Sequence, residues 1–93
     1  PAVEPTNLNE VVEDVVELMA GRAKDLNVKL EMSPSPDLPL VSVDPEGLNR
    51  ALLNIVSNAL DATEGKEGAQ VTVGARPAEE GWARIVVLDN GTG

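Results

Sequence analysis

The sequence contains neither cysteine nor histidine, and Trp82 is its only aromatic residue. The absence of cysteine excludes a disulfide framework and a thiolate metal site, and the absence of histidine excludes chemistry at an imidazole of this chain. We expect Trp82 to pack rather than to bind. No segment approaches the roughly 18 consecutive apolar residues of a membrane span, and the first residues lack the basic-then-apolar pattern of a signal peptide. We therefore expect no direct contact with a membrane.

Basic residues are scarce as well, with 7 Lys and Arg against 16 Asp and Glu and a formal net charge of −9. A negative electrostatic field of this kind opposes binding to nucleic acid, because that binding depends on basic side chains that neutralise the phosphates. No nucleic-acid partner is therefore expected. The field also opposes a bare triphosphate, so a nucleotide is expected to arrive with a divalent cation. The alternative is that the excess acid only keeps the surface soluble, because the acidic residues are spread rather than clustered.

The length of 93 residues fits one small domain or part of one. We interpret residues 1–5 as a linker. Apolar residues then recur at intervals of three and four, which predicts an amphipathic helix over Leu8–Leu26. A second helix is predicted to start at Asp44-Pro45 and to include Leu48–Thr63, because an acid is a good N-cap and proline fits the first helical position.

Three strands are predicted around these helices. Alternation indicates one short strand with a single buried face at Val28–Met32, and Val71–Ala75 and Trp82–Leu88 are joined by a loop long enough for a hairpin. Because the segment Ile85–Leu88 is apolar without alternation, we expect it to be covered on both faces or to lie centrally. The fold class is an α/β (α+β) two-layer sandwich, with helices on one face of a mixed, largely antiparallel sheet.

Two polar motifs carry the functional information. The second helix places Asn54 and Asn58 four residues apart on its polar face, with Asp61 three residues further on. Carboxamide oxygens are neutral ligands for a hard cation. Asp89 stands at the end of the last apolar strand, before the Gly91-Thr92-Gly93 turn, where glycines let a backbone approach a ligand closely. The alternative for Asn54, Asn58 and Asp61 is that they only form the solvated face of the helix. The alternative for Asp89 is that it caps the strand end by accepting hydrogen bonds from nearby backbone N–H groups.

In this order and spacing the two motifs resemble a known family. The helix is similar to the N box, and Asp89–Gly93 is similar to the G1 box, of the ATPase superfamily that joins sensor histidine kinases, DNA gyrase, MutL and a heat-shock chaperone. The segments Asn7–Glu10 and Leu38–Leu48, which lead into the two helices, resemble those of bacterial sensor histidine kinases. The resemblance covers residues 6–93 and implies a partial Bergerat ATP-binding fold.

The resemblance implies a role for each site residue. Asn58 would bind the Mg²⁺ that bridges the ATP phosphates, and Asn54 would lie on the neighbouring turn of the same face. Asp89 would accept a hydrogen bond from the adenine amine, with Gly91 and Gly93 shaping the base pocket. Asp61 is placed with the cofactor-binding residues, although many sensor kinases carry a basic residue near that position.

Asn54 favours the kinase branch of this superfamily. The gyrase and MutL branch carries a glutamate there as a general base for water, and a carboxamide cannot replace it. Transfer of phosphate to a histidine needs no activated water. A gyrase- or MutL-type ATPase fragment is therefore one alternative, and a non-catalytic interaction module of the same fold is another.

The resemblance also predicts the setting of the chain. The second glycine box and the lid that hold the phosphates would follow Gly93, so we expect residues 6–93 to be a partial ATP-binding domain without catalytic activity of its own. The cytoplasmic parent kinase would transfer the ATP γ-phosphate to a histidine on a separate dimerisation domain, and from there to a response regulator. Because strands expected after Gly93 would pair beside Trp82–Leu88, we also expect the 93 residues to self-associate through an open edge.

Overall fold

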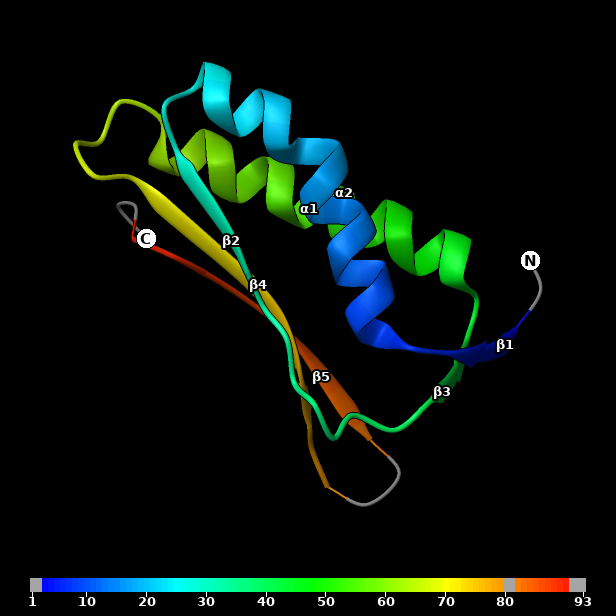
Figure 1. Cartoon of the computed structure of the whole chain (residues 1–93). Coiled ribbons are helices and arrows are strands. Elements are labelled where there is room, and N and C mark those ends of the chain that lie inside the picture. The colour runs from blue at the N-terminus through cyan, green and yellow to red at the C-terminus, as the bar shows by residue number, and fades with distance from the viewer. Residues whose placement is uncertain (1–2, 80–81, 91–93) are drawn as a thin grey trace.

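The computed structural model describes residues 3–79 and 82–90. The elements follow in the order β1 (Glu4–Thr6), α1 (Leu8–Asp25), β2 (Lys29–Ser33), β3 (Val41–Val43), α2 (Pro45–Thr63), β4 (Gln70–Pro77) and β5 (Ala83–Asp89). Both helices lie on one face of the sheet formed by β2, β4 and β5 (Figure 1). The predicted two-layer sandwich with a mixed sheet is therefore confirmed.

Strand β4 is the middle strand of this sheet, parallel to β2 and antiparallel to β5. The prediction that Ile85–Leu88 is central or covered on both faces is wrong, because β5 lies at the sheet edge among the described strands. Its apolar residues divide between the two faces. Val87 is half-buried on the helix side, whereas Leu88 projects from the other side and is 64% exposed.

A short antiparallel ribbon of β1 and β3 lies beside the main sheet, with Glu4 paired to Val43 and Thr6 to Val41. The ribbon corrects the interpretation of residues 1–5 as a linker, because Glu4 and Pro5 belong to β1. Each of the two strands has only three residues, which is too short to show the alternation that identifies a strand. Pro5 also argues against a strand unless that strand lies at an edge.

The core lies between the helices and the helix-facing side of β4. Its most deeply buried residues are Val12 and Val15 of α1, Leu52, Val56 and Leu60 of α2, and Val71 and Val73 of β4. Burying an aliphatic side chain of this kind contributes about 1.5–3 kcal/mol. This apolar contact fixes the orientation of α2, so that its polar residues point away from the sheet.

Candidate nucleotide-binding site

Helix α2 is oriented by its ends and by its buried face. The Asp44 carboxylate caps the first turn by accepting a hydrogen bond from the Glu46 backbone N–H at 3.2 Å. At the last turn, the Thr63 hydroxyl lies 3.1 Å from each of the Ala59 and Leu60 carbonyls. Because the face between these ends is buried, the opposite face is held toward solvent. Asn54, Asn58 and Asp61 all lie on that exposed face.

Neither carboxamide has a local structural task. Within residues 3–79 and 82–90, the Asn54 and Asn58 side chains make no hydrogen bond or ion pair, whereas asparagine is among the weaker helix formers. Caps, turns and back-bonding are the usual reasons for asparagine in a helix. None of them applies here, which favours a ligand-binding role for the pair.

An apolar groove runs between α2 and β5, with a cavity of about 310 Å³. Its walls are formed by Leu48, Ala51, Leu52 and Ile55 of α2 and by Ile85 and Val87 of β5. Ile55 follows Ala51 by four residues and Asn58 follows Ile55 by three, so Asn58 lies on the same side of α2, next to the groove. The carboxamide therefore stands at the rim of an apolar cleft.

Asp89 stands at the end of the opposite wall. Val87 pairs with Val73 of β4, and Asp89 pairs with Val71. Residues two positions apart on a strand point to the same face. The Asp89 side chain therefore projects from the helix-facing side of the sheet, as Val87 does. The end of β5 and the end of α2 lie at the same end of the molecule (Figure 1). Asn58 and Asp89 thus lie just beyond the residues that line the groove, on α2 and on β5. Gly91 and Gly93 lie outside the described residues.

Asn90, to which the sequence analysis assigned no role, holds the end of β5 against the start of β4 and the turn before it. Its Oδ1 accepts a hydrogen bond from the Gln70 backbone N–H at 2.8 Å, and its Nδ2 donates to the Gly68 carbonyl at 3.0 Å. The Asn90 backbone N–H also donates to the Gln70 carbonyl at 3.2 Å. These bonds join the turn after α2 to the residue that follows Asp89. An asparagine directly after a strand is a common turn signal that could have suggested this role.

Asp61 has a partner that the sequence did not reveal. Its carboxylate forms a hydrogen-bonded ion pair with the guanidinium of Arg22, which lies in the last turn of α1. Both side chains are about half exposed. The pair joins the two helices on their solvent side, and it gives Asp61 a structural contact in addition to the predicted cofactor role.

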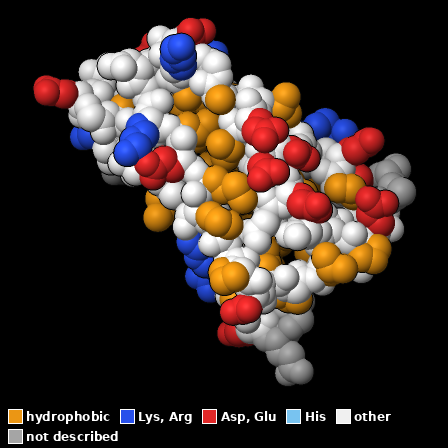
Figure 2. All heavy atoms as spheres, in the orientation of Figure 1, with side chains coloured by type: hydrophobic (Ala, Val, Ile, Leu, Met, Phe, Trp, Pro, Cys, Tyr) orange, Lys and Arg blue, Asp and Glu red, His pale blue; other side chains and the backbone are white. Residues whose placement is uncertain are grey.

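The surface around the helices is acidic. Glu10, Glu13, Asp14 and Glu17 are exposed on α1, and acidic side chains gather on the face seen in Figure 2. Within residues 3–79 and 82–90, no three acidic side chains group as they would around a metal ion.

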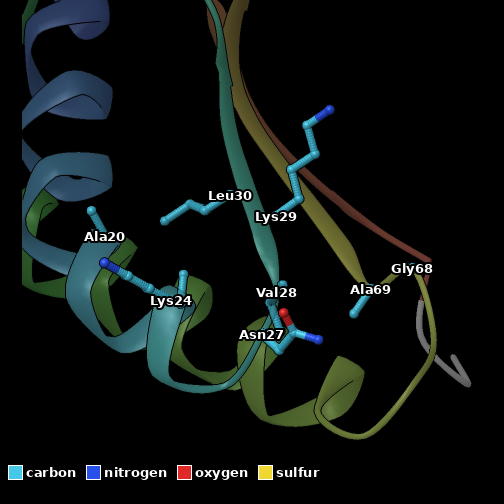
Figure 3. A pocket seen from close by; sticks show the side chains of 9 residues that line it. Ala20, Lys24, Asn27, Val28, Lys29, Leu30, Gly68 and Ala69 are labelled. Atoms are coloured by element: carbon cyan, nitrogen blue, oxygen red, sulfur yellow. The ribbon is translucent and has the colours of Figure 1, made fainter.

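A second cavity, of about 500 Å³, lies where α1 leads into β2 (Figure 3). Lys24 and Lys29 are among its lining residues, but their side chains extend in different directions. The Lys29 ammonium also lies 2.9 Å from the Glu31 carboxylate. These two cations do not form a common anion site, so the groove between α2 and β5 is the better candidate.

Neither helix in the described ranges has the length and apolarity that crossing a bilayer requires.

Comparison with known proteins relates the chain to sensor histidine kinases. It is 40% identical over 96 residues to the sensory histidine kinase/phosphatase NtrB of Klebsiella oxytoca, covering 94% of the chain and 27% of NtrB. The sensor histidine kinase ZraS of Klebsiella oxytoca is 32% identical over 90 residues, covering 97% of the chain and 19% of ZraS. The chain therefore spans about a quarter or less of the length of these relatives.

Solved structures show the same fold. Full-length ShkA in complex with AMPPNP superposes with a TM-score of 0.85 at 29% identity, covering 96% of this chain and 19% of ShkA. A structure of the mycobacterial sensor histidine kinase MprB gives a TM-score of 0.80 at 30% identity, covering 99% of this chain and 58% of MprB. The predicted resemblance to histidine kinases is confirmed.

Residues 43–93, which include α2, β4 and β5, match the family described as histidine kinase-, DNA gyrase B- and HSP90-like ATPase. The match contains both walls of the groove and more than half of the chain. The chain belongs to this ATPase family.

Proposed function

We propose that the chain is the ATP-binding part of a cytoplasmic sensor histidine kinase. The parent protein would transfer the ATP γ-phosphate to a histidine on a separate dimerisation domain, and then to an aspartate of a response regulator. The observation that carries this proposal is the apolar groove between α2 and β5, with the exposed Asn58 three residues beyond the lining residue Ile55 and the exposed Asp89 two residues beyond the lining residue Val87. ShkA, which is 29% identical, was solved with AMPPNP, and this supports a nucleotide ligand.

Each wall of the groove supplies one kind of recognition. The Asp89 carboxylate accepts a hydrogen bond from the exocyclic amine of adenine. Guanine has a carbonyl at the same ring position and cannot donate this bond. The Asn58 amide oxygen is a hard, neutral ligand for Mg²⁺. Asn54 extends the same face by one turn, and Gly91 and Gly93 are proposed to line the base pocket. When bound, Mg²⁺ would neutralise phosphate charge that the acidic surface otherwise repels.

The residue at position 54 favours a kinase over a hydrolase. An asparagine side chain has no useful basicity, so Asn54 cannot activate a water molecule as a glutamate would. Phosphoryl transfer to a histidine requires positioning and charge stabilisation instead. Because the chain contains no histidine, we propose that the acceptor lies in another part of the parent protein.

We also propose that these 93 residues do not catalyse by themselves. Phosphoryl transfer depends almost wholly on holding the phosphates in place. The described residues that line the groove are all apolar, so none of them supplies a basic side chain to hold a phosphate. The 93-residue chain should therefore bind ATP–Mg²⁺ more weakly than the full-length kinase. Calorimetry that gave equal affinities for both proteins would contradict this expectation.

The adenine contact is tested in the full-length protein by titrating ATP–Mg²⁺ and GTP–Mg²⁺ into the Asp89→Asn variant. Losing a hydrogen bond to a charged acceptor costs about 1.5–3 kcal/mol, so ATP affinity should fall roughly ten- to a hundred-fold. The preference for ATP over GTP should shrink with it. Asp37→Asn makes the same charge change in the exposed loop between β2 and β3 and should leave affinity unchanged. If Asp89→Asn behaved like this control, Asp89 would not read the base.

A further inference from the structure

The positive charge beside the last turn of α2 comes from α1. Arg50 is the only basic residue of α2, and it precedes Asn58 by eight residues, about 12 Å along the helix axis. The last turn of α2 contains no basic residue. The guanidinium that lies there belongs to Arg22, in the last turn of α1, which forms the ion pair with Asp61.

This ion pair places the guanidinium of Arg22 near Asn58. Asn58 and Asp61 are three residues apart on the exposed face of α2, a spacing that brings Cβ atoms to about 5–6 Å from each other. The Asp61 carboxylate accepts a hydrogen bond from Nη2 of Arg22. Arg22 is therefore separated from the proposed Mg²⁺ ligand by a single side chain, that of Asp61.

The guanidinium of Arg22 has further donors to offer a ligand. A guanidinium carries five N–H donors, and within residues 3–79 and 82–90 the side chain of Arg22 uses one of them, in the bond to Asp61. The Arg22 side chain is 48% exposed and that of Asp61 is 52% exposed. Arginine binds phosphate through pairs of N–H groups. Arg22 can therefore hold Asp61 with one nitrogen and donate to a phosphate oxygen from the others.

The Asp61 carboxylate is by itself a poor contact for a nucleotide, because it repels the negatively charged phosphates. Paired with Arg22, its charge is neutralised, and the long arginine side chain is held in one place. We propose that Arg22 contacts the phosphates of the nucleotide bound at Asn58, and that Asp61 is a positioning residue that acts through Arg22. This inference rests on the proposed function and adds α1 to the elements that hold the nucleotide.

The phosphate contact is tested in the full-length protein by titrating ATP–Mg²⁺ and adenosine into the Arg22→Ala variant. Adenosine carries the base without the phosphates. Losing a hydrogen bond between charged groups should lower the affinity for ATP–Mg²⁺ about tenfold and leave the affinity for adenosine unchanged. Because Arg22 is half exposed, the loss should become smaller as the NaCl concentration is raised.

Lys24→Ala is the matched control for Arg22→Ala. Lys24 is an exposed cation of the same last turn of α1, but its side chain lines the cavity between α1 and β2 (Figure 3). The control should bind ATP–Mg²⁺ as the wild type does, and circular dichroism shows whether each variant is folded. An equal loss of ATP–Mg²⁺ affinity in both variants would overturn the phosphate contact. An equal loss of affinity for ATP–Mg²⁺ and adenosine in Arg22→Ala would overturn it as well.

The positioning role of Asp61 is tested by combining two substitutions. Asp61→Asn leaves Arg22 without its carboxylate partner, so the affinity for ATP–Mg²⁺ should fall about two- to fivefold. In the Arg22→Ala background, the same substitution should cause no further loss, because Asp61 acts through Arg22. An equal loss in both backgrounds would show that Asp61 acts without Arg22 and would overturn the positioning role.

These outcomes are distinct from a failure of the proposed function. If the wild-type protein did not bind ATP–Mg²⁺, the nucleotide site itself would be wrong, and the role of Arg22 would be wrong with it. If the wild type binds ATP–Mg²⁺ and Arg22→Ala binds it equally well, the nucleotide site stands and only the role of Arg22 is overturned.

Discussion

The Asn90 side chain joins the end of β5 to the turn after α2, and we expect its removal to loosen the whole groove. The Asn90→Ala variant loses the bonds to the Gln70 N–H and to the Gly68 carbonyl, at 2.8 and 3.0 Å. It keeps the backbone bond from its own N–H to the Gln70 carbonyl. The strand should therefore still form, while its junction with the turn weakens.

The size of the effect follows from the two lost bonds. A hydrogen bond of this kind contributes about 0.5–1.5 kcal/mol net, and the exposed position allows water to replace the partners. We therefore expect Asn90→Ala to lower the free energy of unfolding by about 1–2 kcal/mol. For a chain of this length each kcal/mol corresponds to roughly 4–8 °C in Tm, so the midpoint should fall by about 5–15 °C. Urea and thermal unfolding followed by far-UV circular dichroism measure both quantities.

Gln70→Ala is the matched control for Asn90→Ala. It leaves the backbone N–H that Asn90 uses and removes only the side-chain amide, whose hydrogen bond to Glu31 is long, at 3.4 Å. Its stability should change by no more than about 0.5 kcal/mol. In the full-length protein, Asn90→Ala should also weaken ATP binding, because Asp89 is the preceding residue. An unchanged midpoint for Asn90→Ala would show that the two side-chain bonds contribute nothing and would refute the reasoning.

Four further substitutions test the roles of single residues. Asn58→Ala should abolish autophosphorylation of the full-length kinase without lowering its Tm, and a melted domain would make Asn58 structural instead. Asp61→Asn should change the free energy of unfolding by less than about 1 kcal/mol, because the ion pair between Asp61 and Arg22 is half exposed. The same variant should lower the affinity for ATP. If a calorimetric titration found the affinity unchanged, Asp61 would serve only to join the two helices. Gly74→Ala should destabilise the fold by about 1–3 kcal/mol, because a Cβ at this position would clash with the Ser33 carbonyl oxygen. Gly21→Ala has open space around its Cβ and should stabilise α1. Equal urea midpoints for the two variants would contradict both expectations.

Local patterns in the sequence predicted most of the fold. The three- and four-residue periodicity identified both helices, and α1 ends one residue before its predicted end, at Asp25 rather than Leu26. The Asp44-Pro45 pair marked the start of α2 because a cap acts within one turn. The strands of the main sheet were also recognised. Each of these elements is specified by a periodicity or a capping residue that lies within the element or within a few residues of it.

The missed features depend on partners far apart in the sequence. Arg22 pairs with Asp61 across 39 residues, and Asn90 reaches back 22 residues to Gly68. Strand β1 is defined only by its pairing with β3. No local periodicity encodes such contacts. The edge position of β5 was missed for a related reason, because an apolar run does not reveal how many strands flank it.

The helix that carries the site explains why the asparagines stand out. Each asparagine costs up to about 0.7 kcal/mol relative to alanine in a helix interior. Leu52, Val56 and Leu60 are at most 1% exposed and contribute about 1.5–3 kcal/mol each, so burial on one face outweighs poor propensity on the other. Alanine at position 54 or 58 should therefore leave α2 as stable as before or slightly more so. The two asparagines weaken their own helix, their side chains form no hydrogen bond within it, and they lie near a groove. A bound ligand explains these three features best. If Asn58→Ala loses nucleotide binding without losing stability, the role of Asn58 is to bind a ligand and not to support the fold.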